Sequence, residues 1–198
     1  AIRQESLVIS LLAISTAFLT PVLLGGDLQP SQHYLLLLYI LIVDLGVLGI
    51  STFRNWRWLT LIGILASYLL FQVWIEAIPP PSLFLAQSGL TGIFLIFVGA
   101  TTLFHVIWHR VPRTLDMPMM MLNAFLYFGV TYELLWSQYQ AWFGLIAIAL
   151  SLFYLAIGYG AMRRKNVPPQ VALFSLGTAL IFLTLSVPLQ LSGLWITV

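Results

Sequence analysis

Asp44 is the residue whose position in this sequence most strongly indicates chemistry. It interrupts an apolar run over residues 35–43, and the run resumes over residues 45–53 before ending at Arg54. Because the hydrocarbon core of a bilayer needs about 20 apolar residues of helix, the carboxyl group is predicted to lie near the middle of a membrane-spanning helix. An ionised carboxylate there costs about 2.5–3.5 kcal/mol on insertion scales. We therefore expect Asp44 to face other helices or water.

Two interpretations of Asp44 stay open. In the first, it is an ion or proton site of a transport pathway. In the second, it is a hydrogen-bonded group that fixes how its helix docks against its neighbours, as polar side chains often do between membrane helices. The possible partners predicted to lie within the bilayer are Asn123, Thr101, Thr102 and Ser67.

Two further sets of residues are candidates for binding. Asp27, Glu76 and Glu133 are predicted to lie near the outer ends of spans, where they could form an acidic rim that attracts cations or could simply be solvated. His105 and His109 are four positions apart, so they share one helical face and could ligate a metal, haem or the magnesium of chlorophyll. No Glu or third His accompanies them, so we predict no cofactor.

Composition narrows the class of protein further. The chain has 198 residues, of which 61% are hydrophobic and only 7% are charged, whereas a soluble domain has about 25% charged residues. Cysteine is absent, which excludes thiol nucleophiles and Cys-ligated metals within this sequence. We find no phosphate-binding loop and no nucleophile–base pair. The sequence therefore favours a non-catalytic membrane protein, and nothing in it indicates nucleic-acid binding.

Hydropathy predicts the elements that must position these residues. Continuous apolar segments without period-2 alternation indicate helices rather than an outer-membrane barrel. We predict an all-α integral membrane protein, a polytopic bundle of about seven transmembrane helices built from antiparallel hairpins and forming one domain over residues 1–198. The predicted spans are residues 6–24, 34–53, 59–77, 83–108, 117–136, 141–161 and 170–189.

The basic residues predict the orientation of these spans. Every Lys and Arg falls on one predicted side, at the chain start or in the turns after the second, fourth and sixth spans. They are Arg3, Arg54, Arg57, Arg110, Arg113, Arg163, Arg164 and Lys165. By the positive-inside rule this side and the N-terminus are cytoplasmic. Contact with anionic lipid head groups explains the basic turns without another partner.

Five segments resemble a known family. The similarity is clearest in residues 2–6, 18–21, 41–48, 54–59 and 187–197, and it covers essentially the whole chain. The family is domain of unknown function 2339, a group of polytopic inner-membrane proteins of bacteria, whose members are typically much longer. The resemblance implies that this chain is an internal portion of a longer protein. It implies no activity.

These observations leave two classes of function. We expect a non-catalytic subunit or scaffold of a larger membrane assembly, in contact with lipid and with other membrane subunits or the rest of a longer chain. The alternative is a transporter or channel-like protein with Asp44 in a midplane site for an ion or substrate.

Overall fold

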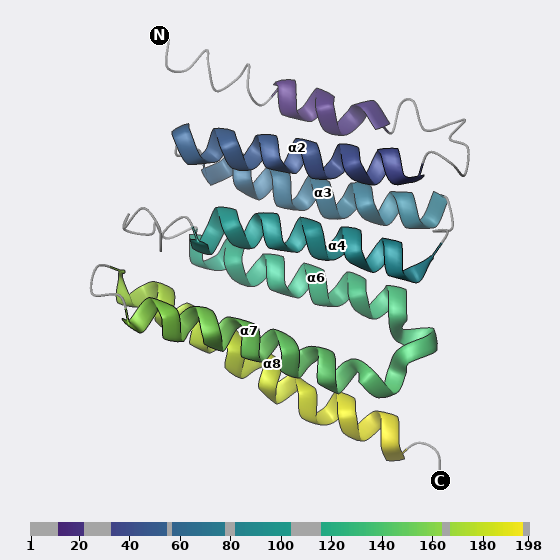
Figure 1. The fold of residues 1–198 in the computed structure, drawn as a ribbon, viewed down its shortest axis with the longest axis vertical. Coiled ribbons are helices and arrows are strands. Elements are labelled where there is room, and N and C mark those ends of the chain that lie inside the picture. Colours follow the sequence, from purple (N-terminus) through teal and green to yellow (C-terminus); the bar gives the residue numbers. More distant parts are fainter. Residues whose placement is uncertain are drawn as a thin grey trace. The chain divides into compact units, whose positions relative to one another are not determined.

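The computed structural model describes residues 12–21, 33–54, 57–77, 82–103, 116–163 and 167–195, and these residues are all helical or in short turns between helices (Figure 1). A short helix over Leu12–Pro21 comes first. The elements that follow are α2 (His33–Arg54), α3 (Arg57–Ala77), α4 (Leu83–Val98), the π-helix η3 (Gly99–Leu103), α6 (Asp116–Tyr139), the 3₁₀ turn η4 (Gln140–Trp142), α7 (Phe143–Arg163) and α8 (Pro169–Trp195).

The chain divides into two compact units, residues 1–100 (unit 1) and residues 101–198 (unit 2). In unit 1, α2 packs against both α3 and α4, and these two helices also contact each other. The buried side chains between them are large and apolar, including Ile40, Ile64, Phe71, Leu90 and Phe97. Because these helices are apolar on all sides, apolar side chains fill the interior of unit 1 and also cover its outer surface.

Side-chain hydrogen bonds fix two helix positions in unit 1. The Tyr39 hydroxyl on α2 donates to the carbonyl oxygen of Ala17 at 2.9 Å, which ties the Leu12–Pro21 helix to α2. At the start of α4, the Ser82 hydroxyl oxygen accepts a hydrogen bond from the Leu85 backbone N–H at 3.2 Å. This N-cap satisfies one of the backbone donors that a helix start leaves free.

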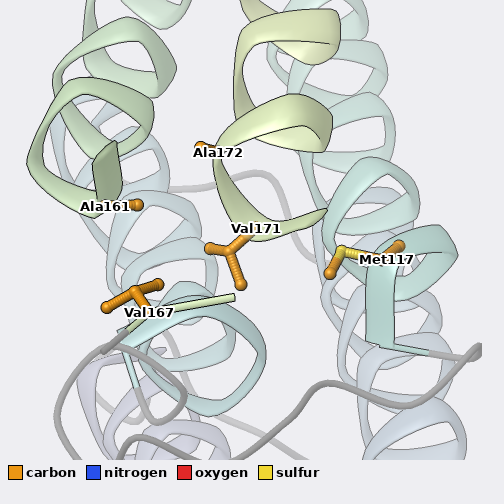
Figure 2. Close-up of a cluster of buried hydrophobic side chains, with 5 residues drawn as sticks. All are labelled: Met117, Ala161, Val167, Val171 and Ala172. Carbon is orange, nitrogen blue, oxygen red and sulfur yellow. The ribbon is translucent and has the colours of Figure 1, made fainter. Parts of the chain in front are cut away.

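In unit 2, α7 and α8 form a long helical hairpin, and α6 contacts both of them. Near the turn of the hairpin, small and medium apolar side chains make a buried cluster of Met117, Ala161, Val167, Val171 and Ala172 (Figure 2). Val171 lies between Met117 at the start of α6 and the pair Ala161 and Val167 (Figure 2). This cluster joins the beginning of α6 to the α7–α8 turn.

Aromatic rings hold the opposite end of α6 to α7 and α8. Tyr132 stacks on Trp136 with ring centroids 4.4 Å apart, and both rings contact Phe143 at 5.2 and 5.3 Å. Phe128 contacts Phe143 and, on α8, Phe182. Tyrosine and tryptophan are typical of the ends of membrane helices, where an amphipathic ring meets the interface.

The helical fold predicted from the sequence is confirmed. Four described stretches are long and apolar enough to cross a bilayer, namely Trp58–Glu76, Leu83–Thr101, Met117–Arg163 and Pro169–Gln190. The third is 47 residues long and includes both α6 and α7, while Leu12–Pro21 and Tyr34–Ile50 are shorter apolar helices. The number of seven spans, their common domain and their orientation stay predictions.

Two helices end differently from the prediction. The fourth span changes at Gly99 from α-helix to a π-helix, and the predicted continuation over residues 104–108 lies outside the described residues. The last helix continues through Pro188 to Trp195, six residues beyond the predicted end at Leu189. Pro188 removes one backbone donor from the helix. The helix nevertheless continues, because backbone groups in an apolar environment need hydrogen-bond partners and the helix provides them.

Candidate functional site

Asp44 lies near the middle of the 22-residue α2, and its side chain is 0% exposed. The hydroxyl of Ser67 on α3 is hydrogen-bonded to Oδ1 of Asp44, and Ser67 is also 0% exposed. Ser67 lies near the middle of the 21-residue α3, so the pair joins the two helices at mid-length. The structure thus places the one carboxyl group of the α2 sequence inside unit 1 rather than on its surface.

Close approach of α2 and α3 depends on Gly63, which lies one turn before Ser67. A Cβ atom at this position would be 2.8 Å from Cγ1 of Val47 and 3.5 Å from Cε1 of Phe97. Val47 is itself three positions after Asp44, so the glycine–valine contact and the serine–aspartate contact are adjacent turns of one helix–helix interface. Small residues permit such contacts between membrane helices.

Glycines of α4 accommodate the other apolar residues of α2. A Cβ atom at Gly92 would lie 3.0 Å from Cδ2 of Leu41, and one at Gly89 would overlap the side chain of Leu37. Asp44 therefore belongs to a helix whose face is packed along most of its length. The carboxyl group lies inside a closely packed contact.

The two oxygens of Asp44 have different surroundings. Oδ1 is bonded to Ser67, whose hydroxyl oxygen is also 2.8 Å from the carbonyl oxygen of Gly63. Oδ2 is buried, and it has no hydrogen-bond partner among the described residues. The arrangement can therefore fasten α2 to α3 through one oxygen, while the other is an acceptor not used by the described residues.

The other predicted members of the intramembrane polar site belong to unit 2. Asn123 on α6 is fully buried, and Thr101 is buried in the π-helix η3. The side chain of Thr102 lies outside the described residues. A partnership of these three residues with Asp44 stays a prediction. Ser67, one of the four possible partners considered from the sequence, is hydrogen-bonded to Asp44 in the structure.

Sequence reasoning did not identify Gly63 as the position of close approach to Val47, and it did not identify residues 99–103 as a π-helix. The signal for Gly63 was its position four residues before Ser67, which places both on the same face of α3. The π-helix carries no such signal, because its sequence Gly-Ala-Thr-Thr-Leu would also fit an α-helix. Single turns of π-helix occur frequently at functional sites.

The predicted acidic rim stays a prediction. Glu76 and Glu133 are both exposed, and Glu76 accepts a hydrogen bond of 3.4 Å from Nε2 of Gln72 on the same helix. Asp27 lies outside the described residues. Glu76 belongs to unit 1 and Glu133 to unit 2.

Most of the predicted basic and ligand residues also lie outside the described part of the chain. Arg163 is exposed at the end of α7, and its guanidinium lies 4.7 Å from the ring centroid of Tyr159. The residues or side chains outside the description are Arg54, Arg57, His105, His109, Arg110, Arg113, Arg164 and Lys165. Within the described residues, no group of three His, Cys, Asp or Glu side chains could hold a metal ion.

The chain matches the model of a known protein family. The model of the family described as "Predicted membrane protein (DUF2339)" matches residues 1–198. No curated protein and no solved structure matches the chain.

Proposed function

The chain belongs to the DUF2339 family of predicted membrane proteins, and from this premise we propose that it is a non-catalytic subunit or scaffold of a larger membrane assembly. It is a multi-pass membrane protein in contact with the lipid bilayer. The role we assign to it is mechanical: its helices present apolar faces to partner helices and hold those faces in fixed positions.

The closed environment of Asp44 is the observation that carries this proposal. The side chain is 0% exposed, it is bonded to Ser67, and a glycine–valine contact packs the adjacent turn. Intramembrane ionisable residues that serve transport usually face a water-filled cavity or belong to a chain of such residues. A carboxyl group bonded to the neighbouring helix in a close contact is better suited to fix the docking of α2 on α3.

The exposed surface of unit 2 supports the same proposal. Along α7, exposed large side chains recur at spacings of three, four and seven residues, which places them on one face: Leu145, Leu152, Leu155, Tyr159 and Met162. Exposed Ala156 and Gly160 lie beside this row. Small residues among large apolar ones permit both lipid contact and close docking of another helix.

Native mass spectrometry of the protein extracted gently from its own membrane tests the proposal. We expect a complex of fixed mass that contains this polypeptide and other polypeptides at constant stoichiometry. A monomer or a homo-oligomer without other polypeptides would contradict the subunit role.

Oδ2 of Asp44 has no hydrogen-bond partner among the described residues. This favours one second candidate, a transporter or channel-like protein with an ion or substrate bound at Asp44. In this case Asp44→Asn abolishes ion-dependent uptake into reconstituted vesicles, while the variant still accumulates in the membrane. Glu76→Gln is the matched control, because Glu76 is a carboxylate exposed near the end of α3. Uptake that is unchanged by Asp44→Asn would exclude this candidate.

We also propose seven spans in the inner membrane of a bacterium, with the N-terminus in the cytoplasm. The support is the segregation of all eight Lys and Arg residues on one predicted side. Since the sequence has no cysteine, single cysteines can be introduced without removing others. An impermeant thiol reagent added to intact cells should label Asp27→Cys and should not label Arg113→Cys. The reverse labelling would invert the orientation.

A further inference from the structure

We propose that Asp44 is a proton-binding site: its carboxyl group is neutral at physiological pH and donates its proton to the hydroxyl oxygen of Ser67, which in turn donates to the carbonyl oxygen of Gly63. This inference goes beyond the scaffold role and does not depend on it. It assigns the ligand of the buried carboxyl group, a proton, and the direction of each hydrogen bond around it.

The argument begins with the number of hydrogens available at Ser67. Its hydroxyl oxygen is within hydrogen-bond distance of both Oδ1 of Asp44 and the carbonyl oxygen of Gly63, the latter at 2.8 Å. A serine hydroxyl carries one hydrogen and can accept two hydrogen bonds, whereas a carbonyl oxygen and an ionised carboxylate only accept. If Asp44 were ionised, a single hydrogen would have to serve two contacts between oxygens.

A neutral Asp44 supplies the missing hydrogen. Its O–H then donates to Ser67, and the Ser67 hydroxyl is free to donate to Gly63, so each of the two contacts contains one hydrogen. Serine commonly bonds to the carbonyl oxygen four residues earlier in a helix, so the second of these bonds is an ordinary local one. The result is two consecutive hydrogen bonds, from the Asp44 carboxyl group on α2 to the Ser67 hydroxyl and from that hydroxyl to the backbone carbonyl oxygen of Gly63 on α3.

No cation in the described surroundings would hold the ionised form instead. The helix Leu12–Pro21 and α4 contain no ionisable side chain, and α3 contributes Arg57, Tyr68 and Glu76. Arg57 is ten positions from Ser67 along α3, and Arg54 is ten positions from Asp44 along α2, which corresponds to about 15 Å along each axis. Neither a phenol nor a carboxyl group can supply a cation, and Glu76 is exposed near the end of α3.

Burial keeps bulk solvent away from the carboxyl group of Asp44. Asp44 and Ser67 are both 0% exposed, and Oδ2 has no hydrogen-bond partner among the described residues. An ionised carboxylate with one oxygen unbonded in an apolar environment is very unfavourable, whereas the carbonyl oxygen of a neutral acid tolerates this position far better. The unbonded Oδ2 is therefore expected to be the carbonyl oxygen of the acid.

Solid-state NMR of the complete chain in lipid bilayers tests the proposal without any substitution. The dipeptide Val43–Asp44 is the only Val–Asp pair in the sequence, so carbonyl-¹³C valine combined with uniformly labelled aspartate selects the signals of Asp44. We expect its carboxyl ¹³C resonance at the lower chemical shift of a neutral acid, both at neutral and at mildly alkaline pH. In a sample that also contains ¹³C-labelled serine, we expect a through-space correlation between the acid proton and the β-carbon of Ser67.

Ser67→Ala, with Ser151→Ala as the matched control, tests the direction of the hydrogen bond. Ser67→Ala should move the carboxyl resonance of Asp44 because the acid loses its acceptor, and Ser151→Ala in unit 2 should leave it unchanged. A carboxylate resonance would overturn the proposal, and so would a resonance that changes when sodium replaces potassium, since this would indicate a bound metal cation. A neutral resonance that neither correlates with Ser67 nor responds to Ser67→Ala would refute the donor role. If the variant does not accumulate, the correlation in the unsubstituted protein decides.

Discussion

In unit 1 the buried polar contact between helices joins a carboxyl group to a hydroxyl, whereas in unit 2 the corresponding contact joins a hydroxyl to a backbone carbonyl. Asp44 and Ser67 connect α2 to α3, and the Ser151 hydroxyl on α7 donates to the carbonyl oxygen of Ala179 on α8 at 2.8 Å. Both units also use glycines, since Gly63 admits Val47 and Gly158 admits Leu176. The difference is that only the unit 1 contact contains a group that can gain or lose a proton.

This comparison shows which contacts are needed to pack two helices together and which add a group that can bind a proton. Glycine contacts and neutral hydrogen bonds are sufficient to pair α7 with α8, so a carboxyl group is not required to join two helices of this protein. The Asp44 contact should therefore be more sensitive to removal of its partner than the Ser151 contact, because a buried acid loses more than a buried carbonyl when its partner is lost. The following substitutions test this statement, beginning with the largest expected effect.

Gly63→Leu should destabilise unit 1 by about 3 kcal/mol, because overpacking a close contact forces both helices to move. Even a Cβ atom would lie 2.8 Å from Cγ1 of Val47, and the β-branched side chain of Val47 has little freedom to turn away. The measurement is unfolding by SDS in mixed micelles. Gly46→Leu is the matched control, since a Cβ atom at Gly46 meets nothing within 4 Å. Equal effects of the two substitutions would mean that the close contact does not determine the packing of α2 on α3.

Ser67→Ala should reduce stability by about 1–2 kcal/mol, since it leaves a buried acid without its partner. The same unfolding assay measures the effect. Ser88→Ala is the control, because Ser88 is exposed on α4 and its hydroxyl donates to the carbonyl oxygen of Leu85 in its own helix. If Ser67→Ala were as mild as Ser88→Ala, the Asp44 contact would not hold the helices together.

Ser151→Ala should cost about 0.6 kcal/mol, the average for hydrogen bonds between membrane helices. The carbonyl oxygen of Ala179 keeps its own position in α8 after the hydroxyl is removed, so less is left unsatisfied than in unit 1. Comparing the midpoints of Ser67→Ala and Ser151→Ala in one assay gives the difference between the units directly. A larger effect for Ser151→Ala would reverse the comparison.

Arg163→Gln should have the smallest effect, about 0.5 kcal/mol or less, because it removes an exposed cation–π contact with Tyr159. A double-mutant cycle with Tyr159→Leu isolates the pairwise part. A coupling energy well above this value would show that the end of α7 is fixed more firmly than an exposed contact allows.

Much of the helical architecture was predictable because a bilayer restricts the choice of backbone structure. Long apolar segments must satisfy their own backbone groups, so hydropathy alone located the helices over residues 34–53, 59–77, 117–136 and 141–161, and the start of the last helix, within a few residues. The positions of their ends were less predictable. Pro188 and Gly99 are ordinary helix-ending residues in water, yet helical structure continues past both of them.

The candidate site was predictable only in part. The position of Asp44 within its apolar run indicated burial, and its side chain is buried. Its partner was not predictable, because Ser67, Asn123, Thr101 and Thr102 were all plausible by depth in the membrane. Depth follows from position along a helix, but the choice among partners depends on how each helix is rotated about its axis.

The sequence by itself thus determined that the protein is helical and membrane-embedded, and that one carboxyl group lies near the middle of a helix. These properties follow from composition and from the length of the apolar runs, because the thickness of the hydrocarbon core sets how many apolar residues a spanning helix needs. Only the tertiary structure decided that Ser67 meets Asp44, that Gly63 admits Val47, and that Oδ2 is left without a described partner. Those contacts depend on the rotation and spacing of packed helices, which hydropathy does not encode because all faces of these helices are apolar.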